Sequence, residues 1–296
     1  MAVTKQETIS SSSSAPLLQA EGIGCAAGGA HAARPVDHRS DIVPFVLLST
    51  QRSGTSWVME RLGAHPEVGA YGEVLLADRE GWPDWPRGAS DRPFFETYLR
   101  SRGLSQSSVR SHRHLFRFLD YLFEPRRGFR AIGFKLMYNE AWPYPEILGY
   151  LKQRQVRVLH LIRENLLDIA LSQIGTAART KVHAWSAEEN EHLRIVVDTE
   201  YLRWWLRWHE RERRIARLLL RAMRLDSYEL SYESLVADDR VLDGALRHLG
   251  ITGISGAALT SRMVKLAPMS HREGIANYAD VERCVAGSRF ERFLRP

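Results

Sequence analysis

The sequence predicts an α/β fold, a P-loop-like three-layer sandwich in which helices flank a central parallel sheet. Three observations favour this class. Short apolar runs typical of buried strands alternate with amphipathic stretches typical of helices. The chain has 296 residues, enough for one large domain of this kind. A short loop rich in Ser and Thr separates the first apolar run from the first helix, at a strand end where such folds bind ligands.

We expect two parts along the chain. Residues 1–40 are rich in Ser, Ala and Gly and show no sustained hydrophobic period, so they are predicted to be a disordered tail. A transit peptide is a weaker alternative for this tail, because acidic residues are unusual in such peptides. Residues 41–296 are predicted to form the folded domain.

Four strands are predicted in the domain, and helical patterns follow them. The predicted strands cover Val43–Ser49, Phe129–Met137, Val156–Ile162 and Leu225–Leu230. A helix is predicted over Ser56–Gly63, and a long helix over Thr199–Arg224. The long helix carries a stripe of apolar and aromatic residues, which we expect to pack in the core: Tyr201, Leu202, Trp205, Leu206 and Trp208.

The segment Gly81–Arg127 is less regular and is expected to be an insertion that forms part of a lid over the substrate. It contains the basic stretch RSHRHLFRF. These basic side chains could line a cleft for an acidic acceptor, but a solvated helix face is the more ordinary explanation. The residues concerned are His112, Arg113, His114 and Arg117.

The overall charge and the cysteine content restrict the class of function. The net charge is +6, with 41 Lys and Arg against 35 Asp and Glu. An anionic ligand would account for this basic excess, but an arginine-rich proteome is the simpler explanation. Basic residues are not clustered with interleaved aromatics, so no nucleic-acid partner is predicted. Two cysteines and scattered histidines predict no disulfide framework and no metal site.

We also expect a cytoplasmic protein without an integral membrane segment. No apolar stretch approaches the length of a membrane span, and the N-terminus lacks the pattern of a secretory signal. The oligomeric state stays open.

The loop QRSGTS, directly after the first predicted strand, is predicted to hold an anion. Glycine permits an unusual φ or a close approach to a ligand, and the following backbone N–H groups lie at a helix N-terminus. Three hydroxyls and one arginine add donors and charge. The alternative is an ordinary helix capped by Ser or Thr. The candidate anion-binding residues are Arg52, Ser53, Gly54, Thr55, Ser56 and Trp57.

This loop does not have the spacing of a Walker loop. A Walker loop has the pattern GxxxxGK[ST], with a lysine before the final Ser or Thr, whereas the basic residue here precedes Ser-Gly. Metal-dependent ATP chemistry is therefore disfavoured, although a kinase-like phosphotransferase remains an alternative. A further alternative is a non-catalytic protein that binds anions or nucleic acid.

A second candidate anion site follows the third predicted strand. Arg163 would project from the carboxyl edge of the sheet, beside the first loop. Asp168 and Ser172 are spaced i,i+4 and share one face of the next helix, which could approach Arg163. Arg163 and Ser172 could thus hold a second phosphate. Considered alone, an arginine at a helix cap and a serine on a polar face are the simpler explanation.

Together the two stretches resemble the two signatures of the sulfotransferases that use 3′-phosphoadenosine 5′-phosphosulfate (PAPS). TQRSGTSW resembles the loop that binds the 5′-phosphosulfate, with Arg52 where that superfamily has Lys or Arg. LIRENLLDIALS resembles the 3′-phosphate signature, with Arg163 and Ser172. The Arg-to-Ser separation is one residue longer than in the cytosolic branch and is similar to that of bacterial carbohydrate-type sulfotransferases.

Two further stretches extend this resemblance. LSYESLVADDRVLDGALRHLGI and KLAPMSHREGIANYADVERCVAGSRFERFL are similar to the C-terminal parts of the superfamily, so the resemblance spans about Ser49 to Leu294. It implies PAPS as the cofactor, 3′-phosphoadenosine 5′-phosphate (PAP) as its product and no required metal. It also implies a small-molecule or carbohydrate acceptor with a hydroxyl group, such as a sugar, a glycolipid or a secondary metabolite.

The resemblance also suggests catalytic residues. In the superfamily an acidic residue at the position of Glu73 serves as the general base, and His65 is the competing candidate. Lys135 lies inside an apolar strand, where its charge needs an anionic partner. The superfamily has a lysine near the sulfuryl group, so Lys135 is a candidate contact to the sulfate. From the closing segment Arg272 is expected to reach the 3′-phosphate, with Lys265 and His271 as alternatives.

Overall fold

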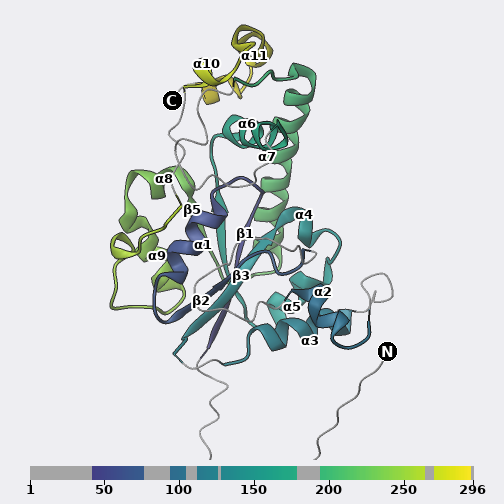
Figure 1. The fold of residues 1–296 in the computed structure, drawn as a ribbon, viewed down its shortest axis with the longest axis vertical. Helices are drawn as coiled ribbons and strands as arrows, with labels where there is room; N and C mark the ends of the chain where they lie inside the picture. The colour runs from purple at the N-terminus through teal and green to yellow at the C-terminus, as the bar shows by residue number, and fades with distance from the viewer. Residues whose placement is uncertain are drawn as a thin grey trace, which may run out of the picture. The chain divides into compact units, whose positions relative to one another are not determined.

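A parallel five-stranded sheet organises the protein (Figure 1). The computed structural model describes residues 42–76, 94–104, 112–125, 128–178, 194–263 and 270–294. The strands lie in the order β2-β3-β1-β4-β5, and all neighbouring pairs are parallel. Their bounds are β1 Val43–Ser49, β2 Val68–Tyr71, β3 Ala131–Met137, β4 Arg157–Ile162 and β5 Ser227–Ser231.

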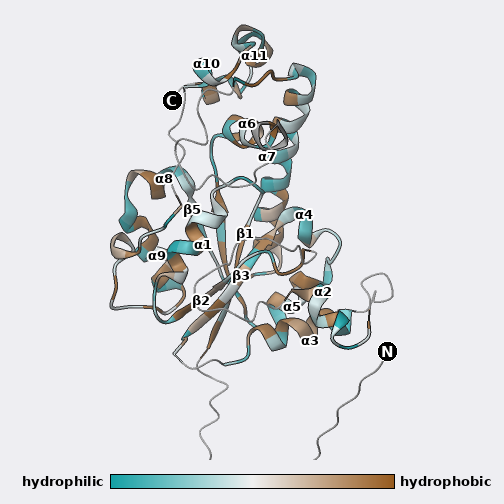
Figure 2. Ribbon diagram, viewed as in Figure 1, coloured by the Kyte–Doolittle hydropathy of each residue, from teal (hydrophilic) through white to brown (hydrophobic). Residues whose placement is uncertain are grey.

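Alternating side chains of the strands build two cores, one on each face of the sheet. In β1, Phe45 and Leu47 pack on one face, where α1 (Thr55–Gly63), α8 (Tyr232–Ala237) and α9 (Leu242–His248) lie. Val46 and Leu48 pack on the other face, against α2 (Phe95–Arg100), α3 (His112–Leu122), α5 (Glu146–Gln153) and the end of α7 (Thr199–Ala222). β1, β3 and β4 are accordingly mostly apolar (Figure 2), with Ser49, Lys135, Arg157 and His160 as their polar residues. This three-layer arrangement confirms the predicted fold class.

The helices differ in length and surround the sheet on both faces. The α-helices are α1 Thr55–Gly63, α2 Phe95–Arg100, α3 His112–Leu122, α4 Tyr138–Ala141, α5 Glu146–Gln153, α6 Leu166–Ala178, α7 Thr199–Ala222, α8 Tyr232–Ala237, α9 Leu242–His248, α10 His271–Gly274 and α11 Tyr278–Val285. Short 3-10 helices cover Asp239–Val241, Gly256–Ala258 and Glu291–Leu294. Within the described part of the chain, no helix is long and apolar enough to cross a bilayer.

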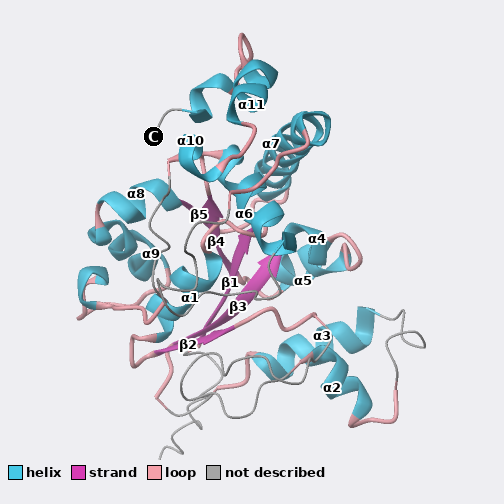
Figure 3. Cartoon of the chain, turned by 45° about the horizontal axis from the view of Figure 1, so that its top comes forward, coloured by secondary structure: helices cyan, strands magenta, loops and turns pink. Residues whose placement is uncertain are grey.

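A third cluster of apolar side chains lies beyond the carboxyl ends of the strands. It joins α6, the first half of α7, α11 and the last 3-10 helix. Figure 3 shows the strands running toward α4 and α6, with α10 and α11 further along the same direction. The carboxyl ends of the strands therefore face a helical layer, and the polar residues discussed below lie between the two.

The sheet has one strand more than the sequence predicts. The four predicted strands are present within two residues of their expected bounds, and β2 is the additional strand. β2 has only four residues, of which Gly69 and Ala70 carry almost no side chain. It is held by pairing with β3, a contact that no local pattern reveals.

The prediction that the aromatic residues of α7 pack in the core is wrong for Tyr201 and Trp208. These side chains are 52% and 38% exposed, respectively, whereas Leu202 and Leu206 are buried as expected. The buried face of α7 follows the leucines, and Tyr201 and Trp208 lie on the opposite side, where each stacks on the half-exposed Trp204.

Only part of the expected insertion Gly81–Arg127 belongs to the described residues, and the predicted tail 1–40 lies outside them. In α3, Leu115, Phe118 and Leu119 are buried. Arg113 and Arg117, on the other side of the helix, are exposed. A solvated helix face therefore accounts for this basic stretch.

Candidate active site

The two predicted anion loops meet where β1 and β4 lie side by side. The connections from β1 and β4 leave the sheet toward opposite edges. The strands β2 and β3 lie on one side of β1, whereas β4 and β5 lie on its other side. In open α/β sheets this switch point forms a crevice at the carboxyl ends of the strands. Thr50–Gly54 and Arg163–Asn165 are the two loops at this crevice.

The first loop turns sharply into α1. Arg52 and Gly54 both have left-handed backbone conformations, with φ of 65° and 84°. Gly54 is the N-cap of α1 and no side chain caps the helix, so the alternative of a Ser- or Thr-capped helix is wrong. The first intrahelical bond runs from the N–H of Val58 to the carbonyl of Gly54, at 3.1 Å. The preceding N–H groups of the helix are available to a ligand.

Gly54 also lies in close contact with the ring of Tyr232. A β-carbon built on Gly54 would come within 2.5 Å of two ring atoms of Tyr232. Tyr232 begins α8, directly after β5, and the guanidinium of Arg163 lies over the same ring at 4.8 Å from its centroid. The ring of Tyr232 thus contacts both loops.

We therefore expect Gly54→Ala to lower the free energy of unfolding by about 1–3 kcal/mol, through overpacking and a strained φ. Urea denaturation measures this change. Gly149→Ala is the matched control, because Gly149 lies in α5 and a β-carbon built on it would meet open space within 4 Å in the described part of the chain. Equal stability of Gly54→Ala and the wild type would contradict the tight fit.

The side chain of Arg52 links the first loop to α6. Its Nε donates a hydrogen bond to Ser172 Oγ at 2.9 Å, and Arg163 Nη1 donates to the carbonyl of Arg52 at 3.3 Å. Burial lowers the pKa of Arg52, the nearby charge of Arg163 lowers it further, and Glu73 opposes the change. Two guanidinium groups are thus held close together, an arrangement that favours an anion between them.

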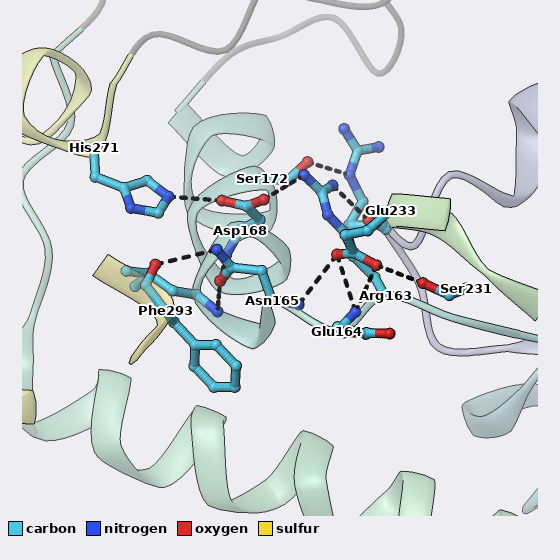
Figure 4. A network of polar contacts seen from close by, with 11 residues as sticks. Arg163, Glu164, Asn165, Asp168, Ser172, Ser231, Glu233, His271 and Phe293 are labelled. Atoms are coloured by element: carbon cyan, nitrogen blue, oxygen red, sulfur yellow. Dashed lines mark hydrogen bonds and ion pairs between the residues drawn. The ribbon is translucent and has the colours of Figure 1, made fainter. Parts of the chain in front are cut away.

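Arg163 is held by Asp168, and Asp168 in turn by His271 (Figure 4). Arg163 Nη2 lies 2.8 Å from Asp168 Oδ2, and His271 Nε2 lies 2.6 Å from Asp168 Oδ1. Burial by itself would raise the pKa of Asp168, but the hydrogen bond with His271 and the charge of Arg163 outweigh it and lower that pKa. His271 comes from α10, so the closing segment reaches this site.

A carboxylate also fixes the backbone of the second loop. Glu233 accepts hydrogen bonds from the N–H groups of Glu164 and Asn165, at 2.9–3.2 Å. Asn165 Nδ2 donates to the carbonyl of Phe293, at 3.1 Å (Figure 4). The YES sequence after β5 thereby positions Arg163 through the loop that carries it.

Two buried polar atoms of this site have no hydrogen-bond partner among the described residues. They are Ser53 Oγ and Arg163 Nε. Buried polar groups in folded proteins are almost always paired, so such atoms call for a ligand or water. Both lie on the loops that the sequence assigns to anion binding.

A second polar cluster surrounds Glu73 at the ends of β2 and β3. Lys135 Nζ lies 2.8 Å from Glu73 Oε1 and donates to Ser56 Oγ at 3.0 Å. The side chains of Lys135 and Glu73 are only 8% and 15% exposed. The structure therefore brings Lys135 together with Glu73 and the start of α1, and Glu73 is the anionic partner that the buried lysine requires.

Glu140 belongs to the same cluster, although the sequence does not predict it as a site residue. It lies in α4, three residues after β3, is 5% exposed, and its Oε2 accepts a hydrogen bond from the N–H of Met137 at 2.9 Å. Burial and the adjacent charge of Glu73 raise the pKa of Glu140. The signal available in the sequence is an acidic residue three positions after a predicted strand.

A buried histidine of α7, which the sequence does not predict as a site residue, contacts the first loop. His209 Nδ1 lies 3.4 Å from Thr50 Oγ1 and 3.2 Å from Glu212 Oε2. Its Nε2 lies 3.3 Å from Gln173 Oε1, next to Ser172 on α6. A polar residue on the buried face of an amphipathic helix was the available signal.

A further polar network, buried at Tyr138 and His160, links β4 and β5 to two helices. Tyr138 Oη lies 2.6 Å from His160 Nε2, and His160 Nδ1 lies 3.1 Å from Glu229 Oε2. The hydrogen bond with His160, followed by that with Arg217, lowers the pKa of Glu229 to about 2. This network joins α4, β4, β5 and α7.

Two predicted site residues, His65 and Arg272, lie apart from these clusters, and a third, Trp57, packs beside the first loop. His65 follows α1 at the amino end of β2, on the opposite edge of the sheet, where burial lowers its pKa. Trp57 packs edge-on against Tyr232, with ring centroids 5.8 Å apart. Arg272 is exposed and lies over the ring of Tyr278. The alternative Lys265 lies outside the described residues.

Known proteins resemble this chain distantly. No protein-family model matches the chain. A segment of 59 residues, 19% of this chain, is 41% identical to Nodulation protein H of Rhizobium tropici, and the match spans 24% of that protein.

Two solved structures match most of the chain. A sulfotransferase of Alicyclobacillus acidocaldarius is 16% identical, with 85% of this chain and 95% of that chain covered and a TM-score of 0.43. A mouse sulfotransferase complexed with PAP is 17% identical, with 85% and 74% covered and a TM-score of 0.38. Both matches are distant in sequence and in structure, and each of the two proteins is described as a sulfotransferase.

Proposed function

We propose that the protein is a sulfotransferase that moves a sulfuryl group from PAPS to an acceptor hydroxyl. The observation that carries this proposal is the pairing of two half-buried arginines, Arg52 and Arg163, beside a helix N-terminus that no side chain caps. The unpartnered atoms Ser53 Oγ and Arg163 Nε lie on the same loops. A ligand with two separate anionic groups, as in PAP and PAPS, fits this donor set.

Each loop would hold one end of the nucleotide. Arg52, Ser53 and the first N–H groups of α1 would bind the 5′-phosphate, and Arg163 with Ser172 would bind the 3′-phosphate. Arg52 and Ser172 are already hydrogen-bonded to one another, so the two phosphate sites share a contact. When bound, PAPS would supply the sulfuryl group.

The second cluster would act on the acceptor. Glu73 would take the proton of the attacking hydroxyl, as a general base. Lys135, 2.8 Å from Glu73, would stabilise negative charge on the transferred group from its position on β3. These roles place the acceptor hydroxyl near Glu73, and we propose a small molecule or a carbohydrate as the acceptor.

A calorimetric titration tests the choice of nucleotide. PAP is expected to bind in the presence of a metal chelator, and more tightly than ADP with Mg²⁺. Equal affinity for ADP with Mg²⁺ would favour the kinase-like phosphotransferase instead. PAP binding without transfer of labelled sulfate to any hydroxyl acceptor would favour a non-catalytic nucleotide-binding protein.

A further inference from the structure

The cluster around Glu73 contains more acidic groups than its neighbouring lysine can neutralise. The carboxyl groups of Glu73 and Glu140 lie next to one another, and Lys135 contributes a single positive charge. Arg52 is the next cation that Glu73 influences, and it is the proposed partner of a ligand phosphate. A second buried carboxylate would thus lack a matched counter-charge, which is costly in a low-dielectric environment.

The hydrogen bonds of Glu140 identify the oxygen that would carry a proton. Oε2 accepts a hydrogen bond from the N–H of Met137, at 2.9 Å. Oε1 is buried and receives no hydrogen bond from the described part of the chain. As a carboxylate oxygen it would be an unsatisfied acceptor, whereas as a protonated oxygen it would be a donor, and the neighbouring Glu73 carboxylate is an acceptor.

We propose that Glu140 is a positioning residue that carries a proton on Oε1 and donates it in a hydrogen bond to the carboxylate of Glu73. This inference rests on the proposed function only where it concerns catalysis. Lys135 also holds Glu73, but in the proposed reaction it turns toward the transferred group. Glu140 would then keep Glu73 oriented toward the acceptor, because it is fixed by the backbone of Met137 and bears no charge of its own.

The protonated state also gives the site a dependence on pH. Burial and the charge of Glu73 raise the pKa of Glu140 to about 8, with Lys135 and the N–H of Met137 acting in the opposite direction. Above that pH, Glu73 and Glu140 would both be charged and would repel each other. Activity is therefore expected to fall as pH rises through this value.

Two measurements test the proton on Glu140 without any assay of activity. The infrared spectrum of the wild type at pH 7 is expected to contain the C=O stretching band of a protonated carboxyl, and Glu140→Gln is expected to remove it. Glu282→Gln, which changes an exposed glutamate of α11, is the control and should retain the band. Absence of the band in the wild type, or its persistence in Glu140→Gln, would overturn the proposal.

The second measurement is the free energy of unfolding as a function of pH. The folded state binds the proton of Glu140 more tightly than the unfolded state, so the resulting stability is fully present below pH 4.5 and is lost as pH rises toward about 8. The stability of Glu140→Gln relative to the wild type is therefore expected to rise over this range. A difference that does not change with pH would contradict a raised pKa.

The role in positioning is tested by turnover. Glu140→Gln keeps a hydrogen-bond donor and is expected to lack the alkaline fall of kcat. Glu140→Leu cannot donate, and its kcat is expected to be about tenfold lower at neutral pH, the effect of one lost hydrogen bond. Equal kcat values for the two variants would exclude the positioning role. If no variant transfers sulfate, the proposed function fails, and the infrared and unfolding data still decide the protonation of Glu140.

Discussion

Glu73→Gln is expected to lower kcat by about 10²–10⁴-fold, the usual contribution of a general base, and to leave the affinity for PAP close to that of the wild type. The glutamine keeps the size of the side chain and can still accept a hydrogen bond from Lys135, but it cannot take a proton from the acceptor. Turnover is measured by the transfer of labelled sulfate, and affinity by calorimetry.

Glu67→Gln provides the matched control for this result. Glu67 directly precedes β2, at the amino end of the strand, whereas Glu73 follows its carboxyl end. Glu67 Oε2 lies 3.6 Å from Arg130 Nη1, at the edge of the sheet away from the cluster around Lys135. If Glu73→Gln turns over as fast as Glu67→Gln does, another group must accept the proton.

Arg52→Ala is expected to weaken PAP binding by about 1.5–3 kcal/mol, the contribution of a hydrogen bond to a charged group, which corresponds to roughly a 10- to 150-fold increase in Kd. Arg163→Ala is expected to have an effect of the same order, through the other loop. Arg52 Nε donates a hydrogen bond to Ser172, and the guanidinium is largely buried. The Arg52 side chain therefore supplies the positive charge and also orders the loop. Calorimetry in the absence of metal measures the change.

Arg221→Ala serves as the control for the two arginine variants. Arg221 is exposed in the last turn of α7, which leads to the amino end of β5 and away from the crevice. Its replacement removes one positive charge from the protein without touching either loop. A similar loss of affinity in all three variants would indicate a general effect of charge, and the two loops would then not be the nucleotide site.

Much of the fold could be predicted because buried parallel strands are continuous apolar runs. β1 was predicted with the bounds that it has, and α7 within two residues at its end. β2 escaped prediction because its small residues carry no such signal. Gly69 is packed so closely that a β-carbon there would lie 3.1 Å from the ring of Phe129, a constraint that comes only from the folded chain.

The candidate site could be predicted only in part, for a similar reason. The residue types and the spacing of the two loops pointed to Arg52 and Arg163, but the contact between Arg52 and Ser172 depends on β1 and β4 being neighbours. The sequence could not distinguish His271 from Arg272. Because Ser270 caps α10, His271 meets Asp168 while Arg272 faces outward. Glu140 escaped notice because its burial arises from tertiary packing alone.

At position 52 the residue type that would favour stability differs from the one that the proposed function requires. Among the described residues, the other non-glycine residues with positive φ are Gln155 and Arg224, which terminate helices at the amino edge of the sheet. Arg52 alone of the three lies at the carboxyl edge, with φ of 65°. Glycine would adopt this conformation at a lower cost, by an amount on the order of 1 kcal/mol. Selection for stability alone would thus favour glycine at this position. The arginine supplies a positive charge instead, and the folded state is less stable than it would be with glycine.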